Sequence, residues 1–138
     1  MLNVYFDGSC GPQNPGGTAA WGYVIKDEEG EVMNQGSGRA CSGQEASNNV
    51  GEFAGLYEAM KVVARDYPDA QVTFNGDATL VINIMNGQAR ARKGKYLPYY
   101  EKAFAFGLPF MVKKQWHFRW IPRALNSEAD ELSQYHRY

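Results

Sequence analysis

The order of strand-like and helix-like segments is the feature that most limits how this chain of 138 residues can fold. Five segments have the residues and flanking turns typical of strands: 2–7, 18–27, 31–40, 71–76 and 114–121. Four segments have the features of helices: 49–66, 78–87, 96–106 and 126–138. Because three strands come first and helices and strands alternate after them, the sequence predicts an α/β fold. Its mixed five-stranded sheet has three antiparallel strands followed by parallel ones, with helices on both faces.

Length and composition favour one domain over residues 1–138, because 44% hydrophobic and 21% charged residues are ordinary for a globular chain. The longest mostly apolar stretch, 103–112, is too short for a membrane span. The N-terminus lacks the pattern of a signal peptide, which predicts a cytoplasmic protein. Cys10 and Cys41 have no metal-binding spacing and are interpreted as reduced thiols.

Charge is distributed unevenly along the chain. Ten of the 15 acidic residues lie in 1–70, and ten of the 14 basic residues lie in 71–138. A basic half can face a polyanion even though the formal net charge is −1. An evenly solvated surface is the alternative, and charge alone favours it.

Four acidic residues lie at positions where strands end or helices begin. They are Asp7 at the end of the first predicted strand, Glu52 in the first turn of the 49–66 helix, Asp77 after the fourth strand, and Asp130 near the start of the last helix. Each also fits a local role. These roles are a capping box for Asn49 and Glu52, a weaker one for Ser127 and Asp130, a helix cap for Asp77, and an Asx turn for Asp7.

The four acids together favour a shared site. Ligand sites in open α/β sheets form at the carboxyl ends of strands, where these residues are expected to meet. Gathered carboxylates repel one another and raise their own pKa values unless cations neutralise them. Mg²⁺ suits oxygen ligands, and two ions about 3.5–4 Å apart can hold the attacking water and the leaving oxygen of a phosphodiester.

The motifs that contain these acids resemble those of type 1 ribonuclease H, in family order and over nearly the whole chain. The matching stretches are "YFDGSCGPQNPGG", "SNNVGEFAGLYEAM", "FNGDATLV" and "WIPRALNSEADELS". The resemblance implies an endoribonuclease that hydrolyses the RNA strand of RNA/DNA hybrids and leaves 3′-hydroxyl and 5′-phosphate ends. It also implies that Asp7, Glu52, Asp77 and Asp130 hold two Mg²⁺ ions, with Mn²⁺ as an alternative, and that Asp7 bridges them.

The resemblance assigns further residues to substrate binding. Gly8, Ser9, Asn14, Asn48 and Asn49 match positions that contact 2′-hydroxyls and bases in the minor groove, and the 2′-hydroxyl marks a strand as RNA. The other members of the set are Ser47 for a DNA-strand phosphate, Thr79, Asn126, and the basic residues Arg90, Arg92, Lys93 and Lys95. For Asn14, which precedes Pro15, a turn role is a strong alternative.

Three features depart from the family pattern. The loop "PRALN" has no histidine, and Arg123 is the nearest candidate for proton transfer or product release. Ala78 replaces the usual serine after Asp77, and Thr79 can compensate. The segment "QARARKGKY" replaces the long basic protrusion of some bacterial members, as in the short, archaeal-like branch. A solvated surface role is the alternative for Arg123, and a solvated turn is the alternative for the basic residues.

The sequence leaves three other functions open. "VYFDGS" resembles the D-x-D motif of phosphatases, but Ser9 stands where the second aspartate belongs. An inactive hybrid-binding module and the nuclease domain of a reverse transcriptase are the others. The starting methionine and the end just after the last helix favour a free-standing protein over a domain of a reverse transcriptase. The partner expected from the resemblance is an RNA/DNA hybrid, with no membrane and no obligate protein partner, so a monomer is expected.

Overall fold

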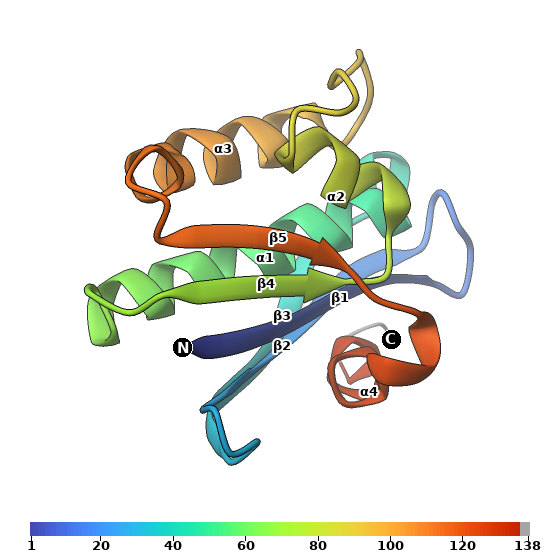
Figure 1. Cartoon of the computed structure of the whole chain (residues 1–138). Coiled ribbons are helices and arrows are strands. Elements are labelled where there is room, and N and C mark those ends of the chain that lie inside the picture. Colours follow the sequence, from blue (N-terminus) through green and yellow to red (C-terminus); the bar gives the residue numbers. More distant parts are fainter. Residues whose placement is uncertain (136–138) are drawn as a thin grey trace.

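A computed structural model describes residues 1–135, and its strands form a mixed sheet with the order β3-β2-β1-β4-β5 (Figure 1). The strands are β1 (Leu2–Gly11), β2 (Thr18–Lys26), β3 (Val32–Ser42), β4 (Val72–Gly76) and β5 (Trp116–Trp120). The pairs β1–β2 and β2–β3 are antiparallel, whereas β1–β4 and β4–β5 are parallel. The predicted fold is therefore confirmed.

Helices cover both faces of this sheet. They are α1 (Asn48–Asp66), α2 (Thr79–Met85), α3 (Leu97–Val112) and α4 (Ser127–Gln134). Figure 1 shows α1, α2 and α3 together on one side and α4 alone on the other, where α4 packs on β1 and β2. Within residues 1–135, no helix is long and apolar enough to cross a membrane.

The core lies between the sheet and α1, as the helical spacing predicts. Phe53, Leu56 and Met60 of α1 are fully buried against Phe6 of β1 and Phe74 of β4. Burying a side chain of this size stabilises the fold by about 1.5–3 kcal/mol. This packing fixes α1 on the central strands, where two of the four acids lie.

Two elements are longer than the sequence predicts. β1 does not end at Asp7 but pairs with β2 as far as Gly11, opposite Thr18. The helix predicted over 96–106 continues to Val112 as α3. Its last turn is held because the Phe110 ring stacks on Trp116, with centroids 4.1 Å apart. The helix predicted over 126–138 is observed as α4, which covers Ser127–Gln134. Residues 136–138 of the predicted range lie outside the described part of the chain.

Candidate metal centre

The register between β1 and β4 brings two of the acids together. The last paired residues of these parallel strands are Tyr5 and Asn75, and Asp7 and Asp77 each lie two residues further on. Because side chains alternate along a strand, both acids continue the same face of the sheet from equivalent positions. Asp7 is therefore placed by the end of the β1–β4 pairing rather than by the end of β1, which was the prediction.

A close approach of α1 to β1 brings in Glu52. A Cβ at Gly8 would lie 2.1 Å from the backbone nitrogen of Glu52, so this contact requires a residue without a side chain. Glu52 is 5% exposed, as is Asp7. One carboxylate oxygen from each of Asp7, Glu52 and Asp77 lies within 4.8 Å of the others. The structure thus gathers three of the four predicted acids into one group.

Asp130 approaches the same place from the opposite face of the sheet. It lies on α4 and lines a cavity of about 340 Å³ with Asp7 and Glu52. A Cβ at Gly22, which pairs with Asp7, would lie 2.6 Å from Cβ of Leu132, so α4 also depends on a glycine contact. Asp130 lies in the same cavity but outside the three-carboxylate group.

The local capping roles are not what these acids do. The N-cap of α1 is Ser47, whose Oγ accepts a hydrogen bond from the backbone nitrogen of Val50, so the capping box of Asn49 and Glu52 is wrong. The N-cap of α2 is Ala78, and no side chain bonds there. The N-cap of α4 makes no side-chain hydrogen bond either. The acids at these helix starts need another explanation.

Burial and mutual repulsion set the protonation of the group. Burial, with the charges of Asp77 and Asp130, raises the pKa of Asp7 to about 7, although a hydrogen bond with Glu52 opposes this rise. Burial, followed by the charge of Asp7, raises the pKa of Glu52 well above its ordinary value. Such shifts are expected where carboxylates share a site without a compensating cation.

The donor set fits a hard divalent cation. All three ligands are carboxylates, which Mg²⁺ and Mn²⁺ accept. Within the described residues, Glu52 Oε2 is buried and no hydrogen-bond donor reaches it. A buried acceptor without a donor is costly, and a bound cation would remove that cost.

Metal-free protein is expected to lose stability as the pH rises. The pKa of Asp7 is about 7 in the folded chain and near 3.8 without these neighbours, so the folded state retains its proton longer than the unfolded state does. The contribution of Asp7 to the free energy of unfolding therefore falls as the pH rises from about 3.8 to about 7. In EDTA we expect the melting temperature at about pH 8 to be roughly 5 °C below that at about pH 5, and Mg²⁺ to restore it at the higher pH.

The check is thermal unfolding at both pH values, with and without Mg²⁺, beside Asp7→Asn. In EDTA the variant should show a smaller decrease with pH, because it has no proton to lose at that position. Equal melting temperatures at both pH values, together with no effect of Mg²⁺, would contradict the assignment.

Several residues predicted to bind substrate surround the same cavity. Gly8, Ser9, Asn14 and Asn48 line it together with Arg123, which is exposed. The Asn14 side chain is not free, because its Oδ1 accepts a hydrogen bond from the backbone nitrogen of Asn48 at 3.2 Å. This contact ties the β1–β2 loop to the start of α1 at the rim of the cavity.

Other predicted residues lie away from the cavity lining. Ser47 caps α1, Asn49 is half-buried in its first turn, and Thr79 is exposed at the start of α2. The four basic residues are all exposed and lie on the segment between α2 and α3: Arg90, Arg92, Lys93 and Lys95.

Asn126 differs most from its predicted role in substrate binding. It is 1% exposed, and its Nδ2 donates to the backbone oxygen of Phe6 at 2.9 Å and to Asp77 Oδ2 at 3.2 Å. Because its Nδ2 already serves Phe6 and Asp77 and the residue does not line the cavity that contains Asp7, Asn126 is not placed to contact a nucleic acid strand there. Its contacts orient Asp77 instead, and this correction follows from its position beneath the surface.

Sequence reasoning missed two contacts of the acids and one further residue that lines the cavity. Gln134 lines the cavity and its Nε2 lies 3.4 Å from Asp130 Oδ2; the spacing of four residues on a helix was the available signal. Cys10 also lines the cavity. The indole nitrogen of Trp120 donates to the backbone oxygen of Asp77, a contact that no sequence pattern indicates.

Comparison with known proteins identifies a family. A family profile described as reverse transcriptase-like matches residues 5–136. The bifunctional protein Rv2228c of Mycobacterium tuberculosis is 29% identical over 136 residues, which cover 96% of this chain. This chain spans about a third of that relative, because the match covers 35% of its length.

Solved structures share the fold over nearly all of the chain. LC11-RNase H1 in complex with an RNA/DNA hybrid has a TM-score of 0.86 at 24% identity, covering 99% of this chain and 96% of that one. RNase H1 from the halophilic archaeon Halobacterium salinarum NRC-1 has a TM-score of 0.79 at 25% identity, covering 96% and 93%.

Proposed function

Because the chain belongs to the reverse transcriptase-like family and has the fold of ribonuclease H1 domains, we propose that it hydrolyses the RNA strand of RNA/DNA hybrids. The observation that carries this proposal is the group of three carboxylates within 4.8 Å, one of which has a buried oxygen that lacks a donor. In the proposal, residues 1–138 form one catalytic domain of a monomeric cytoplasmic endoribonuclease.

The proposed mechanism assigns the metal ligands to this chain's acids. Two Mg²⁺ ions, or Mn²⁺ in their place, would supply an activated water and stabilise the leaving 3′-oxygen, which yields 3′-hydroxyl and 5′-phosphate ends. Asp7, Glu52 and Asp77 would hold these ions, and Asp130, which lines the same cavity as Asp7 and Glu52, would complete the set. Asn126 holds Asp77 in place through its Nδ2.

We assign the residues around the cavity to recognition of the RNA strand. Asn48 and Asn14 lie at its rim, next to Gly8 and Ser9, where 2′-hydroxyls of a hybrid can meet amide and backbone groups. Asn49, Ser47 and Thr79 stay in the proposed substrate set as contacts outside the cavity. Arg123, exposed beside Asp130 in a short turn, is the proposed group for proton transfer or product release.

The basic segment 86–96 is expected to make binding depend on salt. Replacing Arg90, Arg92, Lys93 and Lys95 with glutamine should weaken hybrid binding at low salt and reduce the log–log salt slope by about 0.9 for each phosphate that is no longer neutralised. Fluorescence anisotropy of a labelled hybrid between about 50 and 200 mM salt measures this slope.

A double variant, Lys61→Gln with Lys113→Gln, serves as the control, because both lysines are exposed and lie late in α1 and at the end of α3. Per charge removed, it should change the slope much less than the basic-segment variant. An unchanged slope in the latter would remove this segment from the substrate site.

The experiment that tests the proposed function compares substrates. A labelled RNA/DNA hybrid, single-stranded RNA, double-stranded RNA and duplex DNA are incubated with the protein in Mg²⁺. We expect cleavage within the RNA strand of the hybrid, with 3′-hydroxyl ends. Binding of the hybrid without cleavage would identify a binding module instead, and cleavage of all four substrates equally would contradict the proposed specificity.

A further inference from the structure

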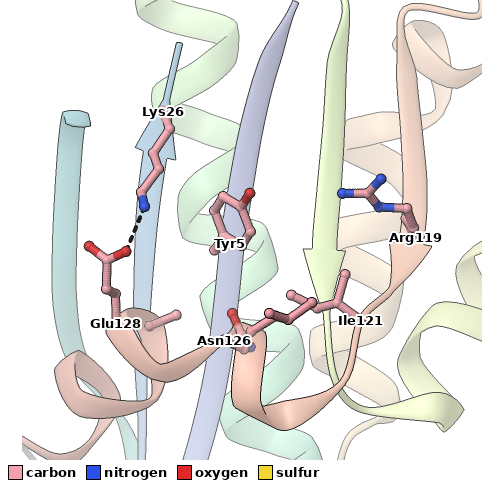
Figure 2. A pocket seen from close by; sticks show the side chains of 8 residues that line it. Tyr5, Lys26, Arg119, Ile121, Asn126 and Glu128 are labelled. Atoms are coloured by element: carbon pink, nitrogen blue, oxygen red, sulfur yellow. Dashed lines mark hydrogen bonds and ion pairs between the residues drawn. The ribbon is translucent and has the colours of Figure 1, made fainter. Parts of the chain in front are cut away.

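A second pocket lies on the α4 side of the sheet, separate from the metal centre. It encloses about 190 Å³, and none of its lining residues lines the cavity that contains Asp7. Its lining comes from β1, β2, β5, the chain between β5 and α4, and the first turn of α4: Tyr5, Lys26, Arg119, Ile121, Leu125, Asn126, Glu128 and Ala129. We call it the Tyr5 pocket (Figure 2).

A buried acceptor at the base of the Tyr5 pocket has no donor. The two hydrogen bonds of Asn126 Nδ2, to Phe6 and Asp77, fix the orientation of its amide. Its Oδ1 is buried, and within the described residues nothing donates to it. Figure 2 shows the Asn126 oxygen on the side that faces Tyr5. An acceptor left in this state is a cost that a ligand donor would remove.

The rim of the Tyr5 pocket carries one excess positive charge. Lys26 is neutralised by Glu128, with its Nζ 2.6 Å from Oε1. Arg119 Nε donates to Asn75 Oδ1 at 2.8 Å, which holds the guanidinium in place. The two terminal nitrogens of Arg119 have no partner within residues 1–135, and Figure 2 shows the guanidinium extending from β5 to the side on which Tyr5 lies. A guanidinium held in this way suits a carboxylate.

The size and lining of the pocket limit the rest of the ligand. A cavity of about 150 Å³ accommodates benzene, so this pocket accommodates one substituted six-membered ring. Tyr5, Ile121 and Ala129 provide apolar surface for such a ring. The single unpaired cation favours a monoanion, because a second negative charge would lie near Glu128 without compensation.

We propose that the Tyr5 pocket binds a small ring-containing organic monoanion. Its carboxylate pairs with Arg119, and a hydroxyl or amino group at the other end donates to Asn126 Oδ1. None of the residues that line this pocket lines the metal-centre cavity, but the two places are linked through Asn126, whose Nδ2 donates to Asp77 Oδ2.

The test is a titration of the ¹⁵N-labelled protein in EDTA with 4-hydroxybenzoate, followed by NMR. We expect saturable shifts of the backbone amides of Ile121 and Ala129 and of the side-chain amide of Asn126. Benzoate, which lacks the donor, and 4-hydroxybenzamide, which lacks the charge, should each bind roughly fivefold or more weakly.

A variant pair extends the test. Arg119→Gln should lose most of the affinity for 4-hydroxybenzoate, whereas Lys113→Gln, which removes one exposed charge at the opposite end of β5, should keep it. The three-compound comparison uses the unaltered protein, so it stands even if Arg119→Gln fails to fold. Absence of saturable shifts, equal affinity for the three compounds, or shifts confined to the basic segment 86–96 would each overturn the proposal.

Discussion

Replacing Asp7 with asparagine is expected to reduce hybrid cleavage on the order of 10³-fold, about 4 kcal/mol of transition-state stabilisation, while leaving the protein folded. Asp7 is one of three acids whose carboxylate oxygens lie within 4.8 Å of one another, so its replacement removes a negative ligand from the group. In EDTA at high pH the same change should raise the melting temperature, because it removes a buried negative charge whose pKa is about 7.

The measurement is the initial cleavage rate in Mg²⁺ together with thermal unfolding in EDTA. Asp69→Asn is the matched control, since Asp69 is an exposed aspartate in the turn after α1. It should change neither quantity appreciably. An Asp7→Asn variant that cleaves within tenfold of the parent rate would show that this group is not the catalytic one.

Adding a single methyl group at Gly8 is expected to be the most damaging small change in the fold. The new Cβ would lie 2.1 Å from the Glu52 backbone nitrogen and 2.2 Å from the Gly51 carbonyl carbon. Both are backbone atoms, so α1 itself must move away from β1. We expect Gly8→Ala to cost about 3 kcal/mol, or roughly 10 °C in melting temperature, and to lower cleavage by displacing Glu52 from Asp7.

Gly30→Ala separates this steric effect from a simple loss of backbone freedom. Gly30 has φ of +84°, and its Cβ would meet nothing within 4 Å. Its replacement should cost only about 1 kcal/mol through backbone strain and leave cleavage unchanged. Melting temperature and cleavage rate are measured for both variants. A Gly8→Ala protein that melts within about 2 °C of the parent, as roughly 1 kcal/mol or less would produce, would contradict the contact.

Much of the fold could be predicted because it depends on local patterns. The buried stripe of α1 and the turn at Gly30 follow from periodicity and turn chemistry. The full length of β1 could not be predicted in this way, because Gly8 and Gly11 give no strand signal. Pairing with β2 extends the strand, and the glycine at 8 serves the contact with α1. Tertiary contacts overrode the local preference at these positions.

The site was predictable in its residue types but not in its detail. Matching of the motifs identified the acids, and the register beyond Tyr5 and Asn75 explains why two of them meet. The role of Asn126 was missed, because its contacts with Phe6 and Asp77 join residues 120 and 49 positions apart. No local pattern indicates a hydrogen bond between such distant residues.

The most direct test of the central claim is the Mg²⁺ dependence of hybrid cleavage, measured beside Mg²⁺ binding by calorimetry for the parent protein and for Asp77→Asn. We predict no cleavage in EDTA, recovery on adding excess Mg²⁺ or Mn²⁺, and loss of both binding and cleavage in the variant. Cleavage that persists in EDTA, or a variant that binds Mg²⁺ and cleaves like the parent, would contradict a metal centre built from these carboxylates.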